Sequence, residues 1–204
     1  YPDSDDPLRQ AMRREVELLF DSVVREDRNV VDLLTADYTF VNERLAKHYG
    51  ISDVYGSQFR RVSLGAELDM RRGLLGKGAL LTITSDAART SPVKRGKWFL
   101  ETFLGISPPD PPPGVETDLK ATPGEAPQTL RARLEAHRIN PTCSASHQIF
   151  EPLGLAMENF DGVGAWRTLD AGFAIDPTGV TNDGVALDGV ASLRTFAVDN
   201  GDLF

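Results

Sequence analysis

Cysteine is nearly absent from this chain: Cys143 is the single cysteine among 204 residues. One cysteine cannot form an intramolecular disulfide, so the fold has to be held together by its packed core. The three histidines, His48, His137 and His147, lie far apart in the sequence. Together with one cysteine they do not supply the clustered four ligands of a structural zinc site.

Long apolar runs and an excess of basic residues are missing as well. No apolar run approaches the roughly 18 residues that span a bilayer. The net charge is -8, and the arginine pairs sit among acidic residues, which argues against nucleic-acid binding. Charged residues make up 25% and apolar residues 41% of the chain, as in globular domains. Because the chain starts at Tyr1 without a methionine or a leader, we expect a processed or excised piece.

The lone cysteine lies in the segment Asn140-Pro141-Thr142-Cys143-Ser144-Ala145-Ser146-His147. In the c-type haem attachment motif C-x-x-C-H, two thiols bond the haem vinyl groups and the histidine ligates the iron. Cys143 and His147 hold the positions of the first thiol and of the ligand, whereas Ser146 stands where the second thiol would be. A hydroxyl forms no thioether, so the pattern indicates a single-link haem site, an engineered variant or a relic.

Other chemistries find less support in the sequence. A nucleophilic thiol at Cys143 would need His147 as its base and a third orienting group, which no nearby residue supplies. The glycine-rich segment 73–78 lacks the spacing of a phosphate-binding loop. No Ser/His/Asp or paired-carboxylate spacing indicates a hydrolase. The spacing Cys-x-x-x-His can also arise by chance, so the interpretation that Cys143 and His147 form no functional site stays open.

Apolar periodicity predicts a mainly helical fold. We expect a long amphipathic helix over 7–28 after the Asp5-Asp6 cap, and another helix that starts at Ser91-Pro92. The other expected elements are helices over 30–34, 38–49, 128–137 and 190–198, a short helix opened by Pro152, a helix or strand over 78–85, a strand over 58–64 and hairpins within 168–190. Cys143 is expected in a loop after the 128–137 helix.

The chain divides into three expected parts. Residues 1–62 form an N-terminal helical segment. Residues 63–167 form a small helical domain that contains a stiff, proline-rich connector over 107–127. Residues 168–204 form a hairpin and helix segment that we expect to be truncated.

Several segments in this order resemble the planctomycete-type cytochrome c-like multidomain proteins, whose domains are largely of unknown function. Residues 37–50 look like the end of one such domain. The cytochrome-like domain that follows is indicated by 72–76, 89–98, the proline run, 140–147 and 152–161, and the last 35 or so residues are similar to the start of a next domain. The family pattern has cysteine where Ser146 stands and commonly methionine where Phe150 stands.

The resemblance implies a small, helical, cytochrome c-like domain that binds haem c and transfers electrons. Cys143 would form the single thioether beside Ser146, and His147 would ligate the iron. The candidate crevice walls are Trp98, Phe99, Phe150, Leu153, Leu155 and Trp166. Met157 is the nearest methionine for the sixth position, for which Met70 and His137 are no better founded. Such a domain would be periplasmic or otherwise exported, with a redox partner or further domains of a larger protein. The alternative is a haem-free descendant that serves as a structural or interaction module rather than as an enzyme.

Overall fold

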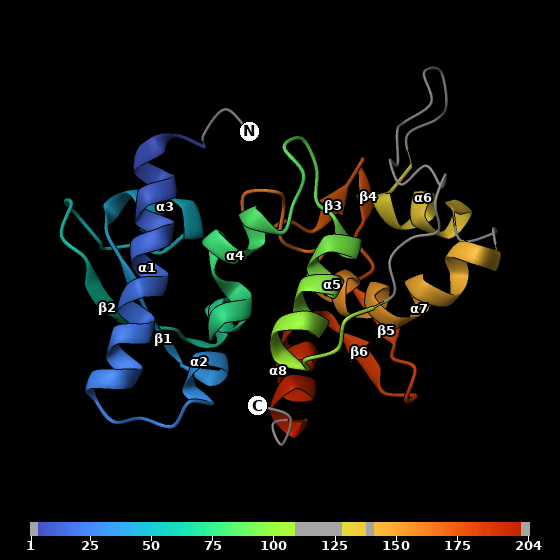
Figure 1. Cartoon of the computed structure of the whole chain (residues 1–204). Coiled ribbons are helices and arrows are strands. Elements are labelled where there is room, and N and C mark those ends of the chain that lie inside the picture. The colour runs from blue at the N-terminus through green and yellow to red at the C-terminus, as the bar shows by residue number, and fades with distance from the viewer. Residues whose placement is uncertain (1–3, 109–127, 138–140, 201–204) are drawn as a thin grey trace.

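The computed structural model describes residues 4–108, 128–137 and 141–200, without the side chains of 137 and 141–146. The described part is mainly helical, as predicted, with short antiparallel hairpins (Figure 1). The helices are α1 (Asp6–Arg25), α2 (Asp32–Thr35), α3 (Glu43–Tyr49), α4 (Gly78–Ile83), α5 (Pro92–Phe103), α6 (Leu130–His137), α7 (Pro141–Leu155) and α8 (Gly189–Asp199). The strands pair as β1 (Tyr38–Val41) with β2 (Arg60–Ser63), β3 (Leu169–Asp170) with β4 (Phe173–Ala174), and β5 (Thr178–Val180) with β6 (Ala186–Asp188).

Helix α1 begins where its sequence predicts. The Asp5 carboxylate accepts a hydrogen bond of 2.8 Å from the backbone N–H of Leu8, which satisfies one of the free donors of the first turn. Residues spaced by three or four along α1 are buried, among them Leu8, Met12, Leu19 and Val23. This apolar face packs against β1, α3 and α4.

The segment 38–49 is not one helix, and the prediction there is wrong. Residues 38–41 form strand β1, which pairs antiparallel with β2 so that Tyr38 lies opposite Ser63. Aromatic and β-branched residues favour a strand once a partner is available, and the partner strand at 60–63 had been predicted. Helix α3 starts only after Asn42, whose side chain accepts from the N–H of Leu45 at 3.0 Å.

Helices α5 and α7 pack against each other (Figure 1), and their backbones come close at two glycines. A Cβ atom on Gly96 of α5 would lie 1.8 Å from the carbonyl oxygen of Phe150 in α7. A Cβ atom on Gly154 of α7 would lie 1.8 Å from the carbonyl oxygen of Pro92 in α5. No side chain fits at either position, so the two glycines set how closely the helices approach.

Helix α7 also corrects two expectations. It runs unbroken from Pro141 to Leu155, so Cys143 lies in a helix rather than in a loop. Pro152 lies inside this helix instead of opening a new one. Proline has no N–H for the carbonyl four residues earlier, which weakens a helix locally. The close packing of α7 on α5 supports the helix across this position.

The C-terminal segment folds onto the same core as α5 and α7. Hairpins β3–β4 and β5–β6 and helix α8 confirm the predicted elements. Leu187, Val190 and Leu193 are buried in one cluster with Phe99 and Phe160. Residues beyond 168 therefore contribute to the core that contains α7.

Candidate functional site

Helix α7 carries the residues of the attachment motif. Positions 143, 146 and 147 all lie in its first half. The side chains of Cys143 and Ser146 lie outside the described residues, and the haem-linking role predicted for them stays a prediction. His147 is the first residue of the motif with a described side chain.

The imidazole of His147 is held by a buried carboxylate. Its Nδ1 lies 2.6 Å from Oε1 of Glu151, four residues later on the same helix face. The two side chains are 16% and 1% exposed. In the neutral imidazole, this bond places the proton on Nδ1 and makes Nε2 the nitrogen with a lone pair. Proteins use this arrangement to orient and activate metal-binding histidines.

Glu151 was not identified from the sequence, although a signal for it was present. His147 and Glu151 are spaced i, i+4, which brings two side chains together only if one helix continues through both. Because proline at 152 predicts the start of a new helix, the sequence does not reveal that α7 continues through this position, or that His147 and Glu151 meet.

Of the predicted crevice walls, Phe150 is buried in the core, Trp98 packs against the same core cluster, and Trp166 is 40% exposed. Phe150 is 6% exposed and its ring centroid lies 5.2 Å from that of His147, so these two are brought together. Trp98 lies on α5 edge-on to Phe103, with ring centroids 5.4 Å apart. Trp166 follows α7 and lies edge-on to Phe160 at 5.1 Å. The tryptophans thus serve packing contacts of their own.

Met157, the methionine predicted for the sixth position, lies just beyond the end of α7. Helix α7 continues for eight residues after His147, a rise of about 12 Å, before Met157 is reached. Its side chain is 2% exposed within the core around α5, α7 and α8. Its predicted role as the sixth iron ligand stays a prediction.

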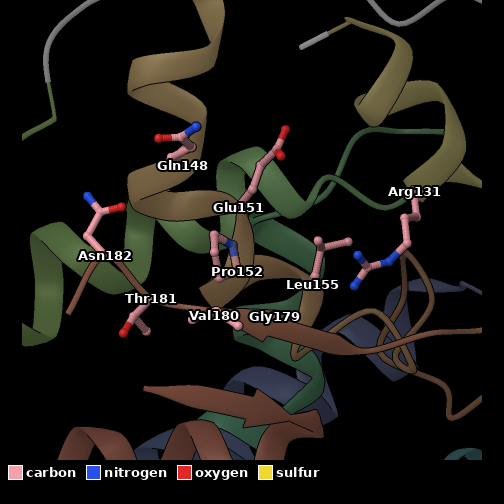
Figure 2. Close-up of a pocket in the computed structure, with 9 residues that line it drawn as sticks. All are labelled: Arg131, Gln148, Glu151, Pro152, Leu155, Gly179, Val180, Thr181 and Asn182. Atoms are coloured by element: carbon pink, nitrogen blue, oxygen red, sulfur yellow. The ribbon is translucent and has the colours of Figure 1, made fainter. Parts of the chain in front are cut away.

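A pocket of about 390 Å³ opens beside Glu151, between α7 and the β5–β6 hairpin (Figure 2). The hairpin lies close to the helix, since a Cβ atom on Gly179 would lie 2.9 Å from Pro152. Arg131 of α6 donates to the carbonyl oxygen of Asp176 at 3.1 Å and so joins α6 to the hairpin. The pocket is lined by Arg131, Gln148, Glu151, Pro152, Leu155, Gly179, Val180, Thr181 and Asn182. Many of these side chains are polar, unlike the apolar walls expected around a porphyrin.

The C-terminal end of α7 is held by a buried arginine that sequence reasoning also missed. Arg95 of α5 is fully buried and donates to the carbonyl oxygens of Met157 at 2.8 Å, Phe160 at 2.7 Å and Asp161 at 2.7 Å. These carbonyls belong to the turn that follows α7, which ends at Leu155. Arg95 thereby fixes the end of the helix that carries His147.

A buried carboxylate lies next to this arginine. Glu158 is 3% exposed, accepts from the hydroxyl of Thr90 at 2.6 Å and pairs with Arg167 at 2.5 Å. Burial raises the pKa of Glu158, and the neighbouring Arg95 opposes that shift. The contact with Thr90 anchors the segment after α7 to the residues just before α5, and the contact with Arg167 holds that segment together.

His48 links the N-terminal segment to the same loop. Its Nε2 lies 2.8 Å from the carbonyl oxygen of Val163. Burial lowers the pKa of His48 below its ordinary value of 6.5, although the bond to Val163 and the charge of Asp161 oppose the shift. The side chain therefore prefers to be neutral in the folded protein.

This preference predicts that His48 makes the protein less stable in mild acid. The unfolded chain takes up the proton near pH 6.5, whereas the folded chain does so only at lower pH. The contribution to stability is thus present above pH 6.5 and is lost as the pH falls toward the folded pKa. Between pH 7.5 and 5.5, the melting temperature of the wild type is expected to fall further than that of His48→Gln. Parallel pH dependence of the two proteins would contradict this assignment.

Among the described residues, no group of three or more His, Cys, Asp and Glu side chains is arranged to hold a metal ion. Within residues 4–108, 128–137 and 141–200, no helix is both long and apolar enough to cross a bilayer.

Two families match the chain. Residues 71–170 match PSCyt3, described as a protein of unknown function (DUF1588). Residues 1–51 match PSD4, described as a protein of unknown function (DUF1592). No curated protein and no solved structure matches the chain significantly. Because the matches follow each other as the sequence resemblance predicts, the chain belongs to the planctomycete-type cytochrome-like multidomain proteins and joins a PSD4 segment to a PSCyt3 domain.

Proposed function

We propose that this chain is a c-type haem domain for electron transfer, with Cys143 as its single thioether link and His147 as the iron ligand. The observation that carries the proposal is the 2.6 Å contact between His147 and the buried Glu151. It supports a metal-ligating role because it fixes the tautomer in which Nε2 can bind iron. The match of residues 71–170 to PSCyt3 supports a cytochrome-like origin.

The donor set fits a haem iron at the proximal position. When bound, the haem would supply one-electron redox chemistry at its iron. The protein would hold it through the Cys143 sulfur and orient it through His147, whose ring Glu151 and Phe150 restrain. Ser146 provides no second tether, so attachment would depend on one bond. Periplasmic or other exported localisation belongs to this proposal, since c-type haem is attached outside the cytoplasm. A redox partner, in another protein or in a further domain, also belongs to this proposal.

The test is expression together with c-type haem maturation machinery. We expect a Soret band, and a haem mass that stays on the chain after denaturation. Cys143→Ala should remove the covalent mass. His147→Ala should retain the mass but change the spectrum, because only the iron ligand is lost. Ser146→Cys should add a second thioether, which the pyridine haemochrome spectrum distinguishes from one.

A haem-free structural or interaction module is the second candidate. It is favoured by the burial of Phe150 and Met157 in one apolar cluster, against which Trp98 packs. The same experiment separates the candidates. If neither Soret band nor haem mass appears after co-expression with the maturation machinery, the electron-transfer proposal fails and the module is favoured.

A further inference from the structure

A cluster of buried charged side chains lies where the PSD4 segment meets the PSCyt3 domain. Glu15 of α1 and Thr39 of β1 come from residues matched by PSD4, and both are 0% exposed. Arg71 and Lys77 come from residues matched by PSCyt3 and are 1% and 0% exposed. Charged groups are rarely buried this completely unless they are paired.

Direct contacts between side chains join the two parts. The Tyr49 hydroxyl donates to Oε2 of Glu15 at 2.6 Å. The hydroxyl of Thr39 donates to Oε1 of Glu15. The ammonium group of Lys77 donates to Oγ1 of Thr39 at 2.9 Å and lies 3.6 Å from Oε1 of Glu15. It also donates to the carbonyl oxygen of Arg71 at 2.9 Å.

The contacts continue from this cluster to the end of α7. The Arg71 guanidinium lies 3.9 Å from the centre of the Tyr49 ring and 5.0 Å from that of Phe160. The carbonyl oxygen of Phe160 accepts from Arg95 at 2.7 Å. An unbroken series of buried contacts therefore connects α1 with the turn that follows α7.

Glu15 is the acidic member between two buried cations. Burial lowers the pKa of Lys77 and of Arg71, and the charge of Glu15 opposes the shift in both. Removing one partner of a buried ion pair leaves the other desolvated and uncompensated, which is far more destabilising than losing an exposed pair. The free-energy cost of burying Lys77 and Arg71 of the PSCyt3 domain is thus offset by Glu15, a residue of the PSD4 segment.

We infer that the PSD4 segment and the PSCyt3 domain of this chain form one cooperative folding unit, locked by Glu15 against Lys77 and Arg71. The inference rests on the buried polar contacts and does not require bound haem. The residues matched by PSD4 and those matched by PSCyt3 then fold together, and this joint unit holds α7 in place.

The test compares Glu15→Gln with Glu17→Gln in the whole chain. Glu17 lies on the same helix, but its side chain is 41% exposed. Hydrogen exchange, followed by mass spectrometry across a urea series, reports separately on peptides from α1 and from α7. In the wild type, both helices should lose protection at the same urea concentration. Glu15→Gln should lower both midpoints together, with a fall of roughly a hundred-fold or more in the folding equilibrium constant. Glu17→Gln should stay within about two-fold of the wild type.

The inference is overturned if α1 and α7 open at different urea concentrations in the wild type, or if Glu15→Gln releases α1 alone. Tyr49→Phe provides a milder variant should Glu15→Gln not fold. It removes the hydroxyl that donates to Glu15 and accepts from the N–H of Gly78 at 2.8 Å. It should shift both midpoints by a smaller and equal amount, and unequal shifts would again contradict a single unit.

Discussion

Gly154→Ala is expected to destabilise the protein by about 3 kcal/mol or more, because no space exists for the added methyl group. The new Cβ atom would lie 1.8 Å from the backbone carbonyl oxygen of Pro92. A backbone group cannot rotate away as a side chain can, so α5 and α7 would have to separate. Separation exposes part of the apolar cluster around Phe99 and Leu153 and loosens the helix that carries His147. Urea unfolding followed by circular dichroism and tryptophan fluorescence measures the loss.

Gly184→Ala is the matched control for this variant. Gly184 has a φ angle of 82°, and nothing lies within 4 Å of its Cβ position. The substitution therefore carries only the backbone cost of a left-handed conformation, about 1 kcal/mol. If Gly154→Ala were no more destabilising than Gly184→Ala, the close approach of α5 and α7 would not be required for stability.

Arg95→Met is expected to destabilise the fold by roughly 3 to 5 kcal/mol. Methionine fills much of the same volume but donates no hydrogen bond. The carbonyl oxygens of Met157, Phe160 and Asp161 would each lose a buried donor. Glu158 would also lose the cation 4.0 Å away that opposes its raised pKa. We expect a lower denaturation midpoint, and faster hydrogen exchange in peptides that cover 155–165.

Lys94→Met supplies the control at the adjacent position. The Lys94 side chain is 56% exposed and pairs with Asp86 at the surface. Removal of one exposed ion pair should change the free energy of unfolding by less than about 1 kcal/mol. Similar effects of the two substitutions would mean that the carbonyls of the α7 end find other donors, and that Arg95 does not hold this turn.

Local sequence signals predicted the elements whose ends are set by neighbouring residues. Asp5 and Ser91 cap helices where expected, because a cap needs only its own side chain and the next backbone N–H groups. The hairpins within 168–190 follow from turn residues between short apolar pieces. Helix α6 forms within the predicted range 128–137 and buries Leu130 and Leu134, which are spaced by four residues.

The errors occur where a distant segment decides the local structure. Residues 38–41 become a strand because 60–63 pair with them. Pro152 is tolerated inside α7 because α5 packs closely against the helix at Gly154. Glu151 was missed for the same reason, since its position beside His147 depends on α7 running through Pro152.

The sequence by itself determined the mainly helical class, the helix caps, the C-terminal hairpins and the resemblance that placed Cys143 and His147 in a cytochrome-like motif. These depend on periodicity, on residues a few positions apart or on an ordered set of short motifs. Only the tertiary structure decided that Glu151 holds His147, that Met157 belongs to the core, and that Glu15 meets Lys77 across 62 positions of sequence. The contact between Glu15 and Lys77 arises because burial brings distant charged groups into one water-free space where each needs a partner, and the local sequence pattern does not indicate which partner that is.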